Sequence, residues 1–185
     1  MWPATSLHPA GPLLEAGSGA PASPQRQWRN AWIVLAIALA LHVTDEALTG
    51  FLPVYNGIVT GLRARFAWVP LPTFTFAVWL GGLVLGVGLL LALSPLVARG
   101  YGWLRVISYA LACLMTGNAL GHVAASLLWR SLAPGALSSP ILLAAAVRLF
   151  VATRRTRRAA GTGAPMRPGA AAGTAVPVDG SPAKA

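Results

Sequence analysis

Four long apolar stretches dominate the pattern of hydrophobic and polar positions along the chain. They cover about residues 28–50, 72–93, 103–130 and 137–153, and most basic residues lie between or outside them. The first three meet the requirement of about 20 predominantly apolar residues for a helix that crosses a bilayer. The fourth is shorter and contains Arg148, whose long side chain can reach the membrane interface from inside a helix end.

These stretches predict helices rather than strands, because an open strand would leave backbone groups unpaired in lipid. The predicted fold is an all-α integral membrane protein, a bundle of four transmembrane helices over residues 28–153. Residues 1–27 are rich in Pro, Gly, Ala and Ser, and residues 154–185 begin with a basic segment and then have the same character. Both ends are predicted to be disordered tails.

Composition agrees with a membrane protein. The chain has 185 residues, of which 56% are hydrophobic and only 10% charged, with a mean hydropathy of +0.65. A soluble domain has about 25% charged residues, and this chain could not cover a water-facing surface with polar groups. A soluble globular protein is therefore excluded, and the length suits one compact bundle.

Aromatic and small residues refine the expected helices. Most tryptophans lie near the predicted boundaries, as interfacial anchors do: Trp28, Trp32, Trp68, Trp103 and Trp129. Trp79 lies within the second stretch and is expected to pack internally. Gly82 and Gly86, four residues apart in the same stretch, predict a close approach between two helices.

The net charge of +10 does not indicate nucleic-acid binding. The largest basic group, Arg154 to Arg158, directly follows the last apolar stretch. Basic residues at that position set the orientation of a span or bind anionic lipid. The predicted partners are the lipid bilayer and anionic lipid at this group, with no nucleic acid, and the oligomeric state stays open. The single cysteine, Cys113, excludes an intramolecular disulfide.

The basic residues also predict orientation. With four spans, both tails and the second loop share one side of the membrane, and ten of the 14 Lys and Arg residues fall on that side. The opposite side has three, Arg63, Arg65 and Arg130. The positive-inside rule therefore predicts a multi-pass protein of the cell inner (plasma) membrane with both termini in the cytoplasm.

Polar residues interrupt the first stretch in a regular way. His42, Asp45 and Glu46 stand at positions i, i+3 and i+4, so they share one face of a helix. The chain has only four acidic residues, and these are the only two outside the tails. An acidic residue near the bilayer centre costs at least about 2.5–3.5 kcal/mol on insertion scales. Such a pair is therefore expected to hold a cation or to share a proton.

The third stretch contains a second polar ridge. Asn118 and His122 are four residues apart and also share one helix face. At about 1.5 Å per residue, the two carboxylates lie roughly 21–23 Å along the first span, counted from Ala31, and Asn118 lies roughly 21 Å along the third, counted from Leu104. Because the first and third spans run in the same direction, the two ridges are predicted to meet in the outer half of the bundle.

The five residues suit two kinds of chemistry. Two imidazoles, two carboxylates and an amide could bind a divalent metal such as Zn, Fe or Mn, so the candidate metal ligands are His42, Asp45, Glu46, Asn118 and His122. The first three are also candidate catalytic residues for acid–base work on an apolar substrate.

The motif "HVTDE", read as His42-x-x-Asp45-Glu46, resembles the signature of the HXXEE-motif family of bacterial multi-pass membrane proteins. Asp45 stands where the family motif has its first Glu. The family also has an Asn and a His in a later span and then a Pro-Gly turn, which Asn118, His122 and the Pro134–Gly135 pair match. The resemblance covers about residues 31–152 and implies metal binding at this motif, with no established activity.

Three functions stay open at this point. One is a membrane enzyme that uses the five polar residues. Another is a transport protein in which the carboxylates bind a proton or cation, although four spans without a detectable repeat are unlike most transporters. The third is a membrane scaffold whose polar cluster only holds helices together. The sequence does not name a substrate.

Overall fold

The computed structural model describes residues 22–68 and 70–162. Within them the chain forms five helices and no strand: α1 Pro24–Thr49, α2 Phe51–Arg65, α3 Phe76–Arg99, α4 Gly102–Trp129 and α5 Ser139–Thr162. The all-helical fold is confirmed. Among the described residues, three helices are long and apolar enough to cross a membrane, namely α1, α3 and α4. The outer parts of the predicted tails, residues 1–21 and 163–185, lie outside the described residues.

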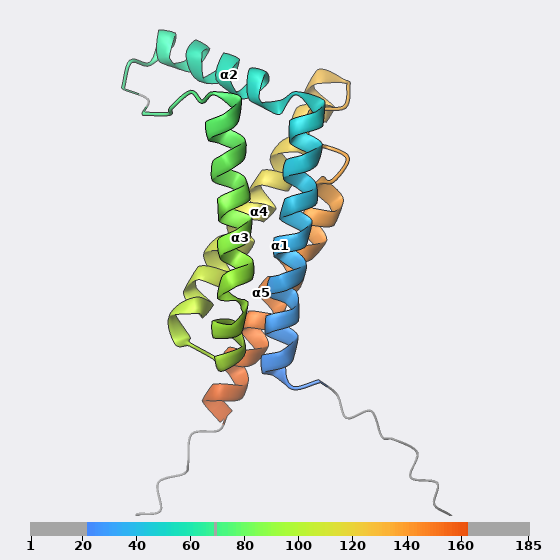
Figure 1. Ribbon diagram of the computed structural model, residues 1–185. Coiled ribbons are helices and arrows are strands. Elements are labelled where there is room, and N and C mark those ends of the chain that lie inside the picture. Colours follow the sequence, from blue (N-terminus) through green and yellow to red (C-terminus); the bar gives the residue numbers. More distant parts are fainter. Residues whose placement is uncertain (1–21, 69, 163–185) are drawn as a thin grey trace, which may run out of the picture.

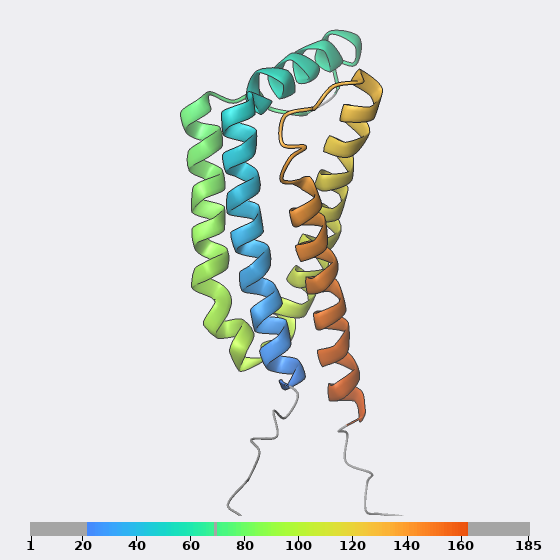
Figure 2. The ribbon, with the colours of Figure 1, turned by 90° about the vertical axis from the view of Figure 1, so that its right-hand side faces the viewer.

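The four long helices run roughly along one axis and alternate in direction, while α2 lies across one end of them (Figure 1). Near that end, Figure 2 shows the order α3, α1, α5 and α4. Helix α1 packs against both α3 and α5, and α4 packs against α5. The first residues of α1 and the last residues of α5 lie together at the end opposite α2 (Figures 1 and 2).

Two helix ends differ from the predicted boundaries. Helix α1 begins at Pro24, four residues before the predicted span, because Ser23 caps it by accepting a hydrogen bond from the Arg26 N–H at 3.4 Å and proline suits the first helical turn. Helix α5 continues to Thr162, so the basic group Arg154 to Arg158 is part of a helix and does not begin a tail.

At the C-terminal end of α1 the structure differs most clearly from the predicted helices. Gly50, at φ 78°, ends α1 and turns the chain directly into α2, a helix that the apolar pattern did not predict. Leu52 and Val59 of α2 are buried. The segment that returns to α3 is held by Asn56, which forms hydrogen bonds of 2.9 and 3.1 Å with the backbone of Phe74.

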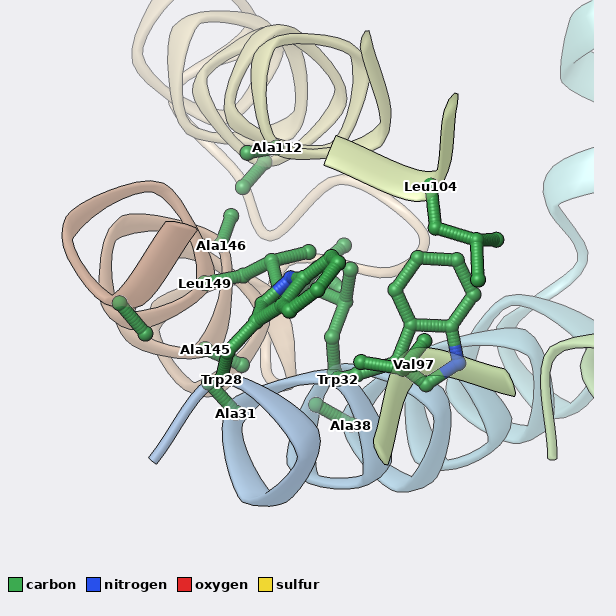
Figure 3. Close-up of a cluster of buried hydrophobic side chains, with 14 residues drawn as sticks. Trp28, Ala31, Trp32, Ala38, Val97, Leu104, Ala112, Ala145, Ala146 and Leu149 are labelled. Carbon is green, nitrogen blue, oxygen red and sulfur yellow. The ribbon is translucent and has the colours of Figure 1, made fainter. Parts of the chain in front are cut away.

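The two first tryptophans lie in the core rather than at an interface. Trp28 and Trp32 are 0% and 1% exposed and sit among side chains of α1, α3, α4 and α5 (Figure 3). The indole N–H of Trp28 donates to Ser108 Oγ at 2.9 Å, and that of Trp32 donates to the Leu90 carbonyl at 2.7 Å. Their prediction as interfacial anchors was wrong, because each indole N–H finds a buried partner on another helix.

The glycines of α3 do not pack as predicted. Gly82 and Gly86 are exposed, and a Cβ added at either would meet nothing within 4 Å. Within the described chain they therefore mediate no close helix approach. Most of α3 presents an apolar outer surface, since only Val97 among its residues is fully buried.

Candidate metal centre

The centre is built by three side chains from two helices. His42 and Glu46 lie one turn apart on α1, and His122 projects from α4. They are 0%, 5% and 6% exposed, which places all three in the interior near the end of the bundle that α2 covers. The two polar ridges predicted from the sequence therefore meet.

The ligand atoms lie at distances that suit one metal ion. His42 Nε2 is 3.4 Å from Glu46 Oε1, and His122 Nε2 is 3.1 Å from the same oxygen. One ligand atom from each of the three residues lies within 4.8 Å of the others. A tetrahedral ion with bonds of about 2.0–2.1 Å separates its ligand atoms by about 3.3 Å. The three side chains could thus hold a metal ion.

Asn118 and Asp45 take different positions from the other three residues. Asn118 Nδ2 is 2.9 Å from His42 Nε2, which is the same imidazole nitrogen that faces Glu46. Asp45 is half-buried and turns away from Glu46, and its Oδ2 accepts hydrogen bonds from the N–H and the hydroxyl of Ser138 at 2.9 and 2.7 Å. Three of the five candidate ligands therefore form one group. The amide of Asn118 contacts this group directly, and the carboxylate of Asp45 reaches it only through Ser138.

Ser138 links the carboxylate of Asp45 to the imidazole of His42. Its Oγ is 2.8 Å from His42 Nδ1. Ser138 has one hydroxyl proton and donates it to the charged Asp45, so Nδ1 of His42 is the donor to Ser138. A neutral imidazole then has a free lone pair on Nε2, the nitrogen that accepts from Asn118. A carboxylate thus orients the histidine through a serine, as in metal sites whose histidine ligands are held from behind.

Asp45 also stabilises the start of α5. Ser138 directly precedes that helix, and its N–H is one of the donors that have no partner inside a helix. A carboxylate at this position satisfies the donor and interacts favourably with the positive end of the helix dipole.

A loop between α4 and α5 closes over the centre. Gly135 lies in it at φ 80°, and a Cβ added there would be 2.9 Å from Glu46 Cγ and 2.9 Å from His122 Cε1. Two hydroxyls from the ends of the polar ridges hold this loop. Thr49 Oγ1 accepts from the Gly135 N–H at 3.1 Å, and Ser126 Oγ accepts from the Ala133 N–H at 3.0 Å.

An apolar pocket of about 280 Å³ adjoins the centre between α2 and α4. Asn118 and His122 form part of its wall, and Phe51 and Tyr55 of α2 line the other side. The ring centroid of Phe51 is 5.5 Å from that of His122, and the His122 centroid is 4.9 Å from that of His42. The buried group of His42, Glu46 and His122 thus adjoins a pocket that is open to the surface of the bundle.

Sequence reasoning missed two residues of the centre. Ser138 was not identified, although a Ser-Ser-Pro run before an apolar stretch is a common helix start. Gly135 was noted only as part of a Pro-Gly turn, and its contact with Glu46 and His122 depends on how the loop folds. No family model, no curated protein and no solved structure matches this chain.

Proposed function

We propose that this chain is a multi-pass membrane protein that binds one divalent metal ion through His42, Glu46 and His122, and that the ion acts on an apolar substrate. The observation that carries the proposal is the spacing of the three ligand atoms, two of whose separations are 3.4 and 3.1 Å. These are close to the separations within a tetrahedral shell. Two imidazoles and one carboxylate suit Zn, Fe or Mn.

Metal binding explains why both carboxylates stay inside an apolar bundle. Glu46 supplies one negative charge directly, and Asp45 supplies a second through Ser138 and His42. A divalent ion offsets the desolvation of both charges. Coordination by His42 Nε2 would use the lone pair that Asn118 Nδ2 now faces at 2.9 Å, and the Asn118 amide would then be available to a substrate.

Three protein ligands leave a further coordination position, as in catalytic zinc sites. A metal ion held by His42, Glu46 and His122 would supply Lewis-acid chemistry. The hydrogen-bond chain from His42 through Ser138 to Asp45 fixes the orientation of the His42 ring. The site therefore favours acid–base work on a group presented from the adjoining pocket.

We propose four spans, with α5 as the fourth and α2 lying at the interface. Support comes from the 24 residues of α5, about 36 Å of helix, and from its packing along α1 and α4. The start of α1 and the end of α5 lie at the same end of the bundle (Figure 2). With the ten-to-three division of basic residues, this favours a plasma-membrane protein with both termini cytoplasmic.

Two further proposals follow from the arrangement. The basic group of α5 is suited to anionic lipid, because Arg154, Arg155, Arg157 and Arg158 are exposed while Thr153 and Thr156 between them are buried. Membership of the HXXEE-motif family is supported by convergence. The HxxDE motif, the Asn–His pair and the Pro-Gly turn come from separate segments and meet at one centre.

Metal analysis of the purified protein tests the proposed function. The wild type should retain about one divalent ion per chain, and both Glu46→Gln and His122→Ala should lose it. His8→Ala, which removes the one histidine outside the two ridges, is the matched control and should retain it.

Other results favour the competing functions. If no metal is bound and infrared spectra show that one carboxyl group is protonated near neutral pH, acid–base chemistry without metal is favoured. Cation flux in vesicles that Glu46→Gln abolishes favours transport. A double variant, Asp45→Asn with Glu46→Gln, that is more stable and binds as much metal as the wild type favours a purely structural cluster.

A further inference from the structure

The pocket beside the centre has a lining of unusual uniformity. Its walls come from α2, α4 and the loop after α4, and no charged side chain is among them: Phe51, Val54, Tyr55, Ile58, Gly117, Asn118, Gly121, His122, Ala125, Trp129, Ala133 and Pro134. The only side chains with nitrogen or a hydroxyl are Asn118, His122, Trp129 and Tyr55. A ligand here meets a mainly apolar surface, in which Asn118 and His122 are the polar side chains next to the centre.

The floor of the pocket is a strip of small residues on α4. Gly117, Gly121 and Ala125 stand at i, i+4 and i+8, and a Cβ added at either glycine would meet nothing within 4 Å. Such strips usually let a second helix approach closely. Here α4 diverges from α3 toward the end that α2 covers (Figure 1), and the strip faces open space.

The polar end of the pocket is His122. This side chain is 94% buried, since 6% is exposed, and its Nε2 faces Glu46. Its Nδ1 and Cε1 lie against Gly135 of the loop after α4. His122 and the neighbouring Asn118 are the polar side chains that α4 contributes beside the centre, and they are suited to one oxygen atom of a ligand.

We propose that this pocket binds an uncharged lipid with a single hydroxyl group at one end, such as a long-chain alcohol. The chain lies on the strip of Gly117, Gly121 and Ala125 beneath the aromatic rings of α2, and the oxygen lies at His122. The assignment of this molecule as a substrate rests on the proposed metal centre, whereas its binding to the pocket does not.

Charge and size select this class. The lining offers a carboxylate or phosphate no cationic side chain, so desolvation of either group in the pocket is costly where no metal ion is bound. A volume of about 280 Å³ lies at the lower end of the range for small-molecule sites, so one chain fits and a diacyl lipid does not.

Quenching of tryptophan fluorescence tests the proposal, because Trp129 lines the pocket. The full chain is placed in phosphatidylcholine nanodiscs and titrated with three brominated probes: a long-chain alcohol, a fatty acid of equal length and a phospholipid. The alcohol should quench in a saturable way, and the phospholipid should give only the non-saturable quenching of the bilayer. In samples without metal, the fatty acid should behave like the phospholipid. Trp129→Phe should remove most of the saturable part.

Neighbouring residues of α4 provide matched variants. Ala125→Leu fills the pocket, whereas Ala124→Leu places the same side chain on an exposed position outside its lining. Apparent affinity for the alcohol should fall at least about tenfold in Ala125→Leu and stay unchanged in Ala124→Leu. Gly121→Leu, which adds a side chain in open space, should repeat the loss and covers the case in which Ala125→Leu does not fold.

Metal content, measured on the same samples, separates this proposal from the proposed function. Saturable alcohol binding in a protein without metal would overturn the metal centre and leave the pocket proposal standing. Equal quenching by all three probes, or equal affinity in the 124 and 125 variants with metal retained, would overturn the pocket proposal alone.

Discussion

Replacing Gly135 by alanine tests the contact between the loop and the centre. At φ 80° an alanine costs about 1–2 kcal/mol of backbone strain. The new Cβ would lie 2.9 Å from both Glu46 Cγ and His122 Cε1, whereas carbon atoms pack best at about 3.5–4.0 Å. Each side chain, or the loop, must therefore move by about 0.6–1.1 Å, the difference between 2.9 Å and those limits.

Displacements of this size should affect stability and metal binding differently. Crowding adds about 1–3 kcal/mol to the strain, for a total loss of about 2–5 kcal/mol. Metal sites tolerate errors of only about 0.2 Å in ligand distance, so metal affinity should fall at least about tenfold. Gly100→Ala is the control. Gly100 has φ 83°, and the nearest atom to its added Cβ is Gln25 Nε2, the end of a flexible side chain, at 3.4 Å.

Two measurements check this prediction. Unfolding in detergent, followed by circular dichroism without added metal, gives the stability of both variants, and competition with a metal chelator gives their affinity. Gly100→Ala should lose only the strain contribution and keep the affinity of the wild type. If Gly135→Ala unfolds like Gly100→Ala and binds metal equally well, then the loop does not constrain the centre and the reasoning is refuted.

Three further predictions follow from the fold. Asp45→Ala removes the acceptor at the start of α5 and should lower stability by about 0.5–2 kcal/mol and metal affinity by about 10–100-fold; unchanged affinity by chelator competition would show that Asp45 only caps the helix. Trp28→Phe loses the bond to Ser108 and should cost about 0.5–1.5 kcal/mol in detergent unfolding without any change in metal content. Reporter fusions after Arg158 and within residues 60–66 should report opposite compartments, and a periplasmic signal from the first would overturn the proposed topology.

The sequence predicted the two polar ridges because their residues are unusual for their surroundings. His42 and Glu46 interrupt an apolar stretch at helical spacing, and so does His122, so their common burial could be expected from the cost of exposing them to lipid. The long helices were predictable for the same reason. Apolar stretches of sufficient length leave few alternatives.

The remaining features depend on tertiary contacts that no local pattern contains. Helix α2 mixes apolar residues with Gly57, Gly61 and two arginines, so its stability comes from where it lies rather than from a strong periodic signal. The burial of Trp28 could not be predicted, since a tryptophan near a helix end fits an interface and a core equally well. The different contacts of Asp45 and Glu46 could not be predicted without knowing where Ser138 lies, and Ser138 is more than 90 residues from Asp45 along the chain.

The assembly of the centre has a consequence for synthesis, since its residues come from helices that are far apart along the chain. In the proposed topology α1 leaves the ribosome first with His42, Asp45 and Glu46 on one face, and the partners on α4 and α5 do not yet exist. From Thr49 to Trp129 is 80 residues, about 4–16 s of translation at about 5–20 residues per second. Through that interval α1 must stay in a water-accessible part of the insertion machinery or bear the cost of two unpaired carboxylates in lipid. The helix that holds two of the three candidate ligands is thus the one that carries carboxylates into the membrane before their partners exist.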